Sequence, residues 1–243
     1  PGTVGICAAL MNKYKVDAIP HIICGGFTKE DTESALIDLK FLGIDNVLAL
    51  RGDPLKNESS FVATKGGSKY AIDLIKQIDD MNNGQYLYEE TKNSPANFCI
   101  GTAGYPEKHF EAMNLNSDLK HLKAKVDAGA KYIVTQLFYD NQKYFEFVKK
   151  CRSIGITVPI IPGLKPLTNL RHLSFIPKFF NTNFPEELSN ELEKSKSNAD
   201  VLKIGTEWAI EQSKELIDAG VPILHFYTMG KGEAVKNIAR EIF

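Results

Sequence analysis

The sequence has no long hydrophobic run. Nowhere do about 18 or more uncharged apolar residues follow one another, which is the length that a membrane-spanning helix needs. The N-terminal stretch PGTVGICAALMNKYKVDAIPH also lacks the basic start and the apolar core of a signal peptide. These two absences predict a cytoplasmic protein that neither enters a membrane nor is exported.

The sequence also has almost no net charge and no metal-ligand motif. With 29 Lys and Arg against 30 Asp and Glu, the formal net charge is −1, which gives no broad positive field for a phosphate backbone. The 4 cysteines form no CxxC pair and no Cys/His ligand set, so we expect buried free thiols in a reducing compartment and no metal site. The expected partner is a small molecule rather than a nucleic acid.

The chain does contain an alternation of short apolar runs with longer amphipathic segments, which is typical of βα units around a parallel sheet. Segments of helical period such as TKEDTESALIDLKFLG and SDLKHLKAKVDAGA lie between the runs, and several close on Gly. No GxGxxG turn follows any strand, which favours an α/β fold of the (β/α)8 TIM barrel type over a doubly wound sheet. The six expected strands are residues 17–24, 46–51, 98–103, 132–138, 159–163 and 223–228.

One barrel domain is expected over residues 1–243, without a second, regulatory domain. The polar segment 182–203 is expected to add a helix and a loop at the barrel rim. Because a closed barrel of this class has eight strands at roughly 30 residues per βα unit, the expected strands are numbers three to eight. We therefore expect the polypeptide to extend upstream of Pro1 by two βα units, or roughly 60 residues.

Active sites of such barrels lie at the carboxyl ends of the strands, so polar residues there are the candidates. Arg51-Gly52-Asp53 ends one strand, and its Gly leaves room for a ligand beside two opposite charges, although a rim salt bridge is the ordinary alternative. A single polar residue of this kind usually has a structural role, but several at successive strand ends favour one ligand pocket. The others are His21, Tyr105, Gln136, His225 and Tyr227.

The helix expected after Tyr105 has a polar face made by Asp118, His121 and Lys125. A solvated surface is the ordinary reading of such a face. The functional interpretation is a nucleotide site, in which the carboxylate meets a ribose diol and the ammonium meets a diphosphate. Tyr105 and His109 could flank the same ligand.

Five segments together resemble the methylenetetrahydrofolate reductase family, in order and with matching spacing, over essentially the whole chain. They are LALRGDP, GYPEKH, DLKHLKAKVDAGAKYIVTQLFYD, IPGLKP and LHFYTM. The resemblance implies a barrel that holds FAD, takes a hydride from NADH or NADPH, and reduces 5,10-methylenetetrahydrofolate to 5-methyltetrahydrofolate in a ping-pong reaction. It also implies a homo-oligomer.

The resemblance assigns roles to individual residues. Asp53 is expected to be the catalytic carboxylate near the flavin and the folate, and Gln136 is expected to bind the pterin through its amide. Lys231 stands where the family often has an Arg that meets the acidic tail of folate. The FAD contacts implied by position are His21, Arg51, Gly52, Tyr70, Ala71, Tyr105, His109, Asp118, His121, Lys125 and Tyr227.

Two features of the family have no direct counterpart in the sequence. Ile176 aligns with an aromatic residue that stacks on folate or nicotinamide in many bacterial members, and Phe175 and Phe179 lie close to it. The family's proton-donating Glu, at the end of the first barrel strand, is expected in the upstream segment. Since no regulatory domain is expected, we predict no inhibition by S-adenosylmethionine.

Two other classes of function stay open at this point. One is a different barrel enzyme, such as a pterin-binding methyltransferase or the flavin-dependent proline dehydrogenase. The absence of a Cys/His zinc set argues against zinc-dependent methyl transfer. The other is a protein that binds flavin or folate without turnover.

Overall fold

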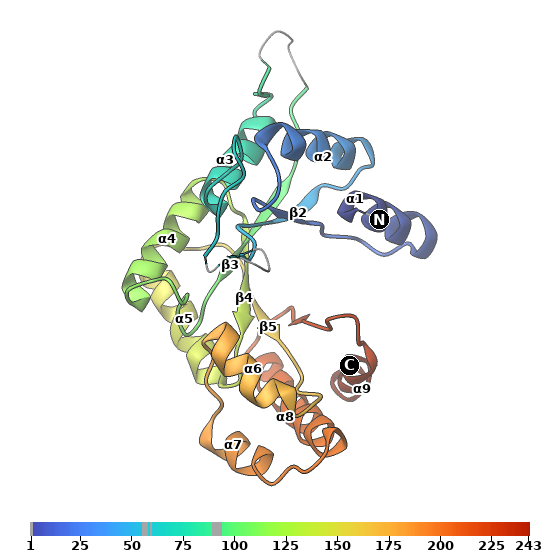
Figure 1. Cartoon of the computed structure of the whole chain (residues 1–243), viewed down its shortest axis with the longest axis vertical. Coiled ribbons are helices and arrows are strands. Elements are labelled where there is room, and N and C mark those ends of the chain that lie inside the picture. Colours follow the sequence, from blue (N-terminus) through green and yellow to red (C-terminus); the bar gives the residue numbers. More distant parts are fainter. Residues whose placement is uncertain (1, 55–57, 59, 89–93) are drawn as a thin grey trace. The chain divides into compact units, whose positions relative to one another are not determined.

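The computed structural model describes residues 2–54, 58, 60–88 and 94–243. The chain divides into two compact units, coloured from blue to red along the sequence in Figure 1. Unit 1 consists of Pro1–Ala103 and Leu122–Ile133, and unit 2 consists of Gly104–His121 and Val134–Phe243. Each unit has a hydrophobic core of its own.

Strands and helices alternate along the chain. The first elements are α1 (Thr3–Ala9), the π-helical turn η1 (Leu10–Tyr14), β1 (His21–Ile23), α2 (Lys29–Phe41), β2 (Asn46–Leu50), α3 (Ala71–Asn82) and β3 (Cys99–Gly104). The next are α4 (Leu115–Asp127), β4 (Tyr132–Leu137), α5 (Asn141–Ser153), β5 (Ile160–Leu164) and α6 (Arg171–Phe180). The last are α7 (Glu186–Leu192), α8 (Asn198–Asp218), β6 (His225–Phe226) and α9 (Glu233–Ile242).

The strands are hydrogen-bonded in the order β1-β2-β3-β4-β5-β6. The pairs β1–β2, β2–β3 and β5–β6 are parallel, with His21 opposite Leu48 and Gly163 opposite His225. Parallel pairing follows from the sequence, because a helix after each strand returns the chain to the same end of the sheet. The six predicted strands and the parallel α/β class are therefore confirmed, while closure into an eight-stranded barrel stays a prediction.

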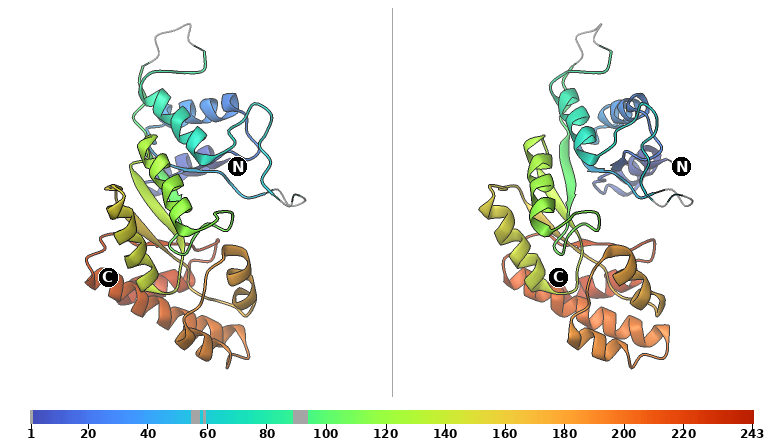
Figure 2. Two further views of the ribbon diagram at one scale, coloured as in Figure 1. Left: turned by 90° about the vertical axis from the view of Figure 1, so that its left-hand side faces the viewer. Right: turned by 60° about the vertical axis from the view of Figure 1, so that its left-hand side comes forward.

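Local sequence signals fix where the helices begin and end. Thr28 caps α2, since its Oγ1 accepts the Asp31 N–H at 3.1 Å and its own N–H donates to Asp31 Oδ2 at 3.0 Å. Gly43, just beyond the end of α2, has a φ of +71°, the left-handed conformation in which Gly is favoured. Figure 2 shows α2 beside α3 in unit 1, where the Gln77 amide of α3 donates to Lys29 O at 2.8 Å.

The polar segment 182–203 differs in part from the expectation. The predicted extra helix is present as α7, but the following helix, α8, already begins at Asn198 inside the segment. The reason is a capping box: Ser197 Oγ accepts the Asp200 N–H at 3.2 Å, and Asp200 Oδ2 accepts the Ser197 N–H at 2.9 Å. Some polar residues of this segment therefore cap the start of α8, and others form the loop before it.

Tyr132 on β4 contacts two other strands of unit 1, β3 and β2. Tyr132 on β4 lies over Gly101 on β3, where a Cβ atom would come within 2.6 Å of the tyrosine oxygen. Its hydroxyl donates to Val47 O on β2 at 3.0 Å, and the side chain is buried. Gly101 is needed here because any larger side chain would occupy the space of the ring.

The cysteines behave as their spacing predicted. Cys7, Cys24 and Cys151 are buried and Cys99 is half-buried, all as free thiols. Burial raises the pKa of each of these thiols, so they stay protonated and pack as small apolar groups. Among the described residues, no helix is both long enough and apolar enough to cross a bilayer.

Candidate functional site

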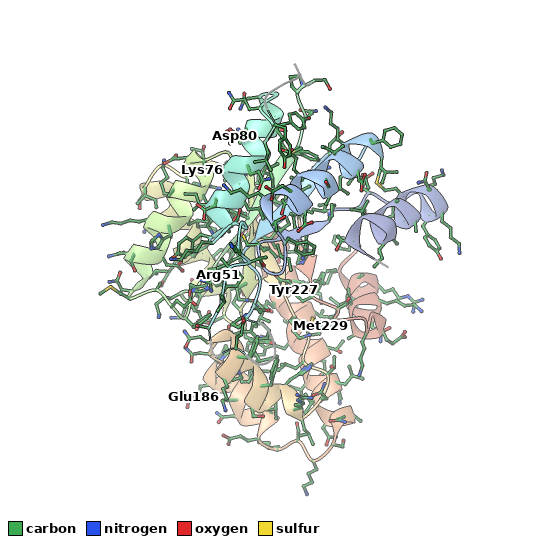
Figure 3. The ribbon with its side chains drawn as sticks, turned by 45° about the horizontal axis from the view of Figure 1, so that its top comes forward. Arg51, Lys76, Asp80, Glu186, Tyr227 and Met229 are labelled. Atoms are coloured by element: carbon green, nitrogen blue, oxygen red, sulfur yellow. The ribbon has the colours of Figure 1, made fainter. Side chains whose placement is uncertain are left out.

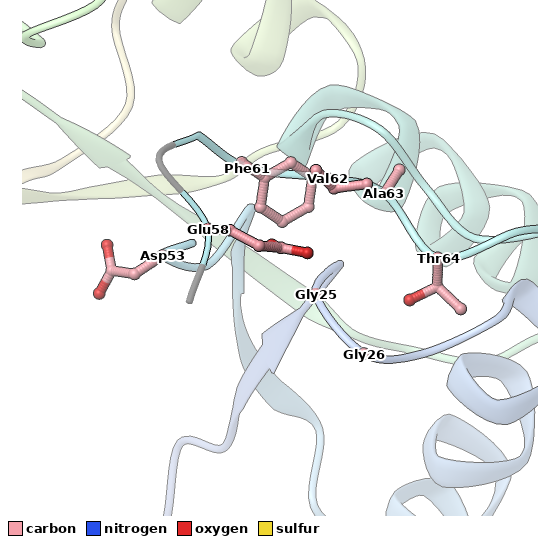
Figure 4. Close-up of a pocket in the computed structure, with 8 residues that line it drawn as sticks. All are labelled: Gly25, Gly26, Asp53, Glu58, Phe61, Val62, Ala63 and Thr64. Carbon is pink, nitrogen blue, oxygen red and sulfur yellow. The ribbon is translucent and has the colours of Figure 1, made fainter. Parts of the chain in front are cut away.

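A small cavity in unit 1 lies where the segments that follow β1 and β2 meet (Figure 4). Its volume of about 170 Å³ is below the roughly 300–1,000 Å³ of sites that enclose a whole ligand, so it can take one group of a larger molecule. The lining residues are Gly25, Gly26, Asp53, Glu58, Phe61, Val62, Ala63 and Thr64. In Figure 4 the Asp53 carboxylate extends away from Phe61 and Thr64, toward solvent.

The Arg51-Gly52-Asp53 turn shapes one wall of this cavity. Gly52 has a φ of +88°, a conformation that L side chains rarely adopt, so the glycine is required by the backbone itself. The turn carries the Arg51 guanidinium over the Phe61 ring at 5.2 Å, within the range of a cation–π contact. Arg51 O also accepts the Gly25 N–H at 3.2 Å, which ties the two strand-end segments together.

His21, Tyr70 and Ala71 also belong to unit 1. His21 begins β1, where partial desolvation lowers its pKa although the residue stays accessible to solvent, so the imidazole is neutral at neutral pH. Ala71 is the first residue of α3, and Tyr70 precedes it with its N–H donating to Asp73 Oδ2 at 2.9 Å. The Tyr70 ring is 49% exposed, so it is open to contact with a ligand.

Lys125 is directed to a strand end and not simply to solvent. Its Nζ donates to Ala103 O on β3 at 2.6 Å, and the residue is half-buried. The ordinary reading of this helical face as a solvated surface therefore does not hold for Lys125. The ammonium lies where barrel enzymes gather their functional groups.

In unit 2, the loop after β3 is bound to the first turn of α4. The His109 N–H donates to Asp118 Oδ2 at 2.8 Å, and the Tyr105 and His109 rings meet edge to face with centroids 4.7 Å apart. The structure thus brings Tyr105, His109 and Asp118 together. His121 lies one turn further along α4 and is exposed.

Glu107 of the same loop is a polar residue that the sequence reading did not select. Its Oε2 accepts the Asn183 N–H at 3.2 Å and the Asn183 side-chain amide at 3.0 Å. Burial raises its pKa, which the two hydrogen bonds from Asn183 partly oppose. The pair joins the loop that carries Tyr105 and His109 to the segment before α7, a contact between distant residues that spacing alone does not reveal.

Gln136 and Tyr227 lie at strand ends of unit 2. Gln136 Oε1 accepts the Leu137 N–H at 2.9 Å, which orients the side-chain amide on β4. The Tyr227 hydroxyl donates to Thr135 O at 2.8 Å, and burial raises the pKa of the phenol to about 12. Tyr227 thus repeats the arrangement of Tyr132, because its ring lies over Gly163 of the neighbouring strand.

A second cavity, of about 120 Å³, lies in unit 2 between the end of β5 and the start of α9. Tyr227 and Met229, which are labelled in Figure 3, follow β6 and line this cavity. The lining residues are Lys165, Pro166, Thr168, Asn169, His172, Tyr227, Thr228, Met229, Lys231, Ala234 and Val235. The predicted substrate residue Lys231 is therefore grouped with Lys165 and His172, which the sequence reading did not assign.

His172 is held neutral in this cavity. Burial and the charges of Lys165 and Lys231 lower its pKa to about 4. Its Nδ1 accepts the Thr168 N–H at 3.2 Å, and its Nε2 lies 3.0 Å from the Asn169 amide nitrogen. The position of Lys165 directly after β5 was the available sequence signal, by the same strand-end rule that selected Arg51.

The residue that aligns with the family's stacking aromatic is neither aromatic nor exposed. Ile176 is fully buried in the core of unit 2. The exposed aromatic residues of α6 are Phe175 and Phe179, with exposed fractions of 37% and 52% and ring centroids 4.9 Å apart. Among the described residues, no cluster of three or more His, Cys, Asp or Glu side chains could hold a metal ion.

Comparison with known proteins gives a consistent result. The family model described as methylenetetrahydrofolate reductase matches residues 1–242. "Methylenetetrahydrofolate reductase (NADH) 1" of Arabidopsis thaliana is 38% identical over 97% of this chain and 40% of the relative. "5,10-methylenetetrahydrofolate reductase" of Escherichia coli strain K12 is 31% identical over 95% of this chain and 72% of the relative. The chain thus spans about two fifths of the length of the plant relative and most of the bacterial one.

A solved structure shares the fold. The Clostridium thermocellum protein, whose title says that it "binds two copies of 5-methyl-5,6,7,8-tetrahydrofolic acid", superposes with a TM-score of 0.52 at 17% identity. The match covers 96% of this chain and 76% of that chain. At this level of identity the likeness concerns the fold alone.

Proposed function

Because the chain belongs to the methylenetetrahydrofolate reductase family, we propose that it forms the catalytic part of an enzyme that reduces 5,10-methylenetetrahydrofolate to 5-methyltetrahydrofolate. The observation that carries the proposal is the family match over residues 1–242. The proposed cofactor is FAD, and the proposed reductant is NADH or NADPH.

The donor set of the chain fits FAD. Arg51 and Lys125 supply cations for a diphosphate, and Lys125 is already oriented by its bond to Ala103 O. Asp118 supplies a carboxylate for a ribose diol, and Tyr70 supplies an accessible aromatic ring. When bound, FAD would accept a hydride from the nicotinamide and deliver it to the folate.

The remaining contacts are proposed from the family motif. In unit 1 they come from His21, Gly52 and Ala71, and in unit 2 from Tyr105, His109, His121 and Tyr227. Neutral His21 can donate one hydrogen bond and accept another, while Gly52 lets the backbone come close to a ligand. The His109–Asp118 hydrogen bond would keep the loop after β3 in place for binding.

Two side chains are proposed to act on the folate. Asp53, exposed at the wall of the unit 1 cavity, would place a negative charge beside the cation that forms as the methylene bridge opens. Gln136 would bind the pterin, because its amide offers a donor and an acceptor side by side. The hydrogen bond from the Leu137 N–H fixes the plane of that amide. Lys231 would meet the acidic tail.

We also propose closure into a (β/α)8 barrel, with these strands as numbers three to eight. β1 and β6 end the observed strand order, and an unpaired strand edge exposes N–H and C=O groups that another strand would cover. Two further βα units would pair both edges and would carry the proton-donating Glu.

Anaerobic stopped-flow spectroscopy of the intact protein tests the function. We expect a bound flavin that NADH or NADPH bleaches in a first half-reaction, and that 5,10-methylenetetrahydrofolate reoxidises in a second. Comparing the two nicotinamides under the same conditions identifies the reductant. Flavin that is bleached but not reoxidised by the folate would exclude the reductase, and protein without flavin would favour a flavin-free barrel enzyme.

A further inference from the structure

The cavity of unit 2 gathers positive charge that no carboxylate offsets. Lys165 and Lys231 both line it, while its described lining contains neither Asp nor Glu. In the described part of the chain, the ion pairs that are present, such as Lys214–Glu211, involve neither of these two ammonium groups. Two unpaired cations beside one cavity are an electrostatic match for an anion.

The charges of Lys165 and Lys231 both act on the His172 side chain in this cavity. Both lower the pKa of His172, so both lie within electrostatic reach of one imidazole. Lys165 is half-buried, and burial lowers its pKa as well. An ammonium that has lost part of its hydration without gaining a partner is poised to bind an anion, because the anion restores the lost electrostatic stabilisation.

Fixed polar groups surround the cations. The Thr168 N–H holds the neutral imidazole in one orientation, and the Asn169 and Thr228 side chains complete the polar wall. The volume of about 120 Å³ is too small for a whole folate, so one end of the substrate fits. Of the two ends, only the glutamate end carries negative charge.

We infer that Lys165 and Lys231 together bind the two carboxylates of the substrate's glutamate end, and that Lys165 sets specificity for a substrate with that dianionic end. The inference rests on the proposed function, in which Lys231 alone was assigned to the acidic tail. It adds a second cation, Lys165, from a different strand end, and both cations lie within electrostatic reach of the neutral His172.

Steady-state kinetics of Lys165→Gln with two substrates provide the test. The first substrate is 5,10-methylenetetrahydrofolate, and the second is 5,10-methylenetetrahydropteroate, which lacks the glutamate. We expect KM for the first to rise about 10-fold, the usual effect of losing one charge-assisted hydrogen bond, with kcat within about twofold. KM for the pteroate should not change. Lys165→Arg should recover most of the lost affinity because it keeps the charge.

Lys203→Gln is the matched control, since Lys203 is exposed on α8 and does not line the cavity. An equal rise of KM for both substrates, or a rise for NADPH and not for the folate, would overturn the inference. Calorimetric binding of the same two compounds separates the two proposals. Folate binding without turnover would refute the proposed reductase, while the affinities of the wild type and Lys165→Gln would still decide the role of Lys165.

Discussion

Gly163→Ala should break the contact that joins β5 to β4 and to the tyrosine beside the unit 2 cavity. A Cβ atom at this position would overlap Thr135 O and lie 2.7 Å from Cε2 of Tyr227. The overlap with a backbone oxygen cannot be relieved by rotating a side chain. The strands must therefore separate, and the ring of Tyr227 must move.

The expected loss in the free energy of unfolding follows from the interactions that this movement breaks. The Gly163 N–H donates to Thr135 Oγ1 at 2.9 Å, and the Tyr227 hydroxyl donates to Thr135 O at 2.8 Å. Each bond contributes about 1 kcal/mol, and overpacking a buried site costs about 1–3 kcal/mol. We expect the free energy of unfolding to fall by about 3–5 kcal/mol. With a urea slope of about 2–3 kcal/mol per M, the midpoint should fall by roughly 1–2.5 M.

Urea unfolding, followed by circular dichroism, measures the effect, and two variants serve as controls. Tyr227→Phe removes only the hydroxyl and should cost about 1 kcal/mol. Gly5→Ala lies in α1 with nothing within 4 Å of the added Cβ, so it should raise the stability by up to about 1 kcal/mol. If Gly163→Ala costs no more than Tyr227→Phe, the steric argument is refuted.

Three further predictions concern the site. Asp53→Asn should slow flavin reoxidation by the folate by a factor of about 10² to 10³ while flavin reduction by nicotinamide is less affected; equal losses in both half-reactions would contradict a folate-specific role. Lys125→Ala should weaken FAD retention on dilution, whereas the exposed Lys120→Ala on the same helix should not, and equal retention would assign Lys125 to structure alone. Between pH 6.5 and 4, the unfolded state binds a proton that His172 in the folded state resists, so this residue makes the stability fall as the pH falls. His172→Gln should reduce that fall by about 1 kcal/mol, allowing for the residue's partial exposure, and urea titrations at both pH values that show no difference would exclude the effect.

The sequence alone determined the succession of elements. Apolar runs and amphipathic periods are local properties, and so are the caps at Thr28 and the glycine after α2, so strands and helices were located to within a few residues. Parallel pairing followed from the alternation of the two. The boundary inside segment 182–203 was missed because polarity alone does not distinguish a loop from the capped start of a helix.

The sequence also selected candidate residues for the site. The strand-end rule selected Arg51 and Asp53, and the polar face of a helix selected Lys125. The family resemblance added Lys231. The positive φ of Gly52 is a second reason for glycine at this position, and only the structure shows it.

Only the tertiary structure decided which side chains meet. That Lys125 reaches Ala103 O, that Asn183 binds Glu107, and that Lys165 shares a cavity with Lys231 depend on contacts between residues far apart in the sequence. The same holds for burial, which places Ile176 in the core and leaves Phe175 and Phe179 of the same helix exposed. The physical reason is that pairwise distance and desolvation are set by packing, and packing depends on the whole chain at once.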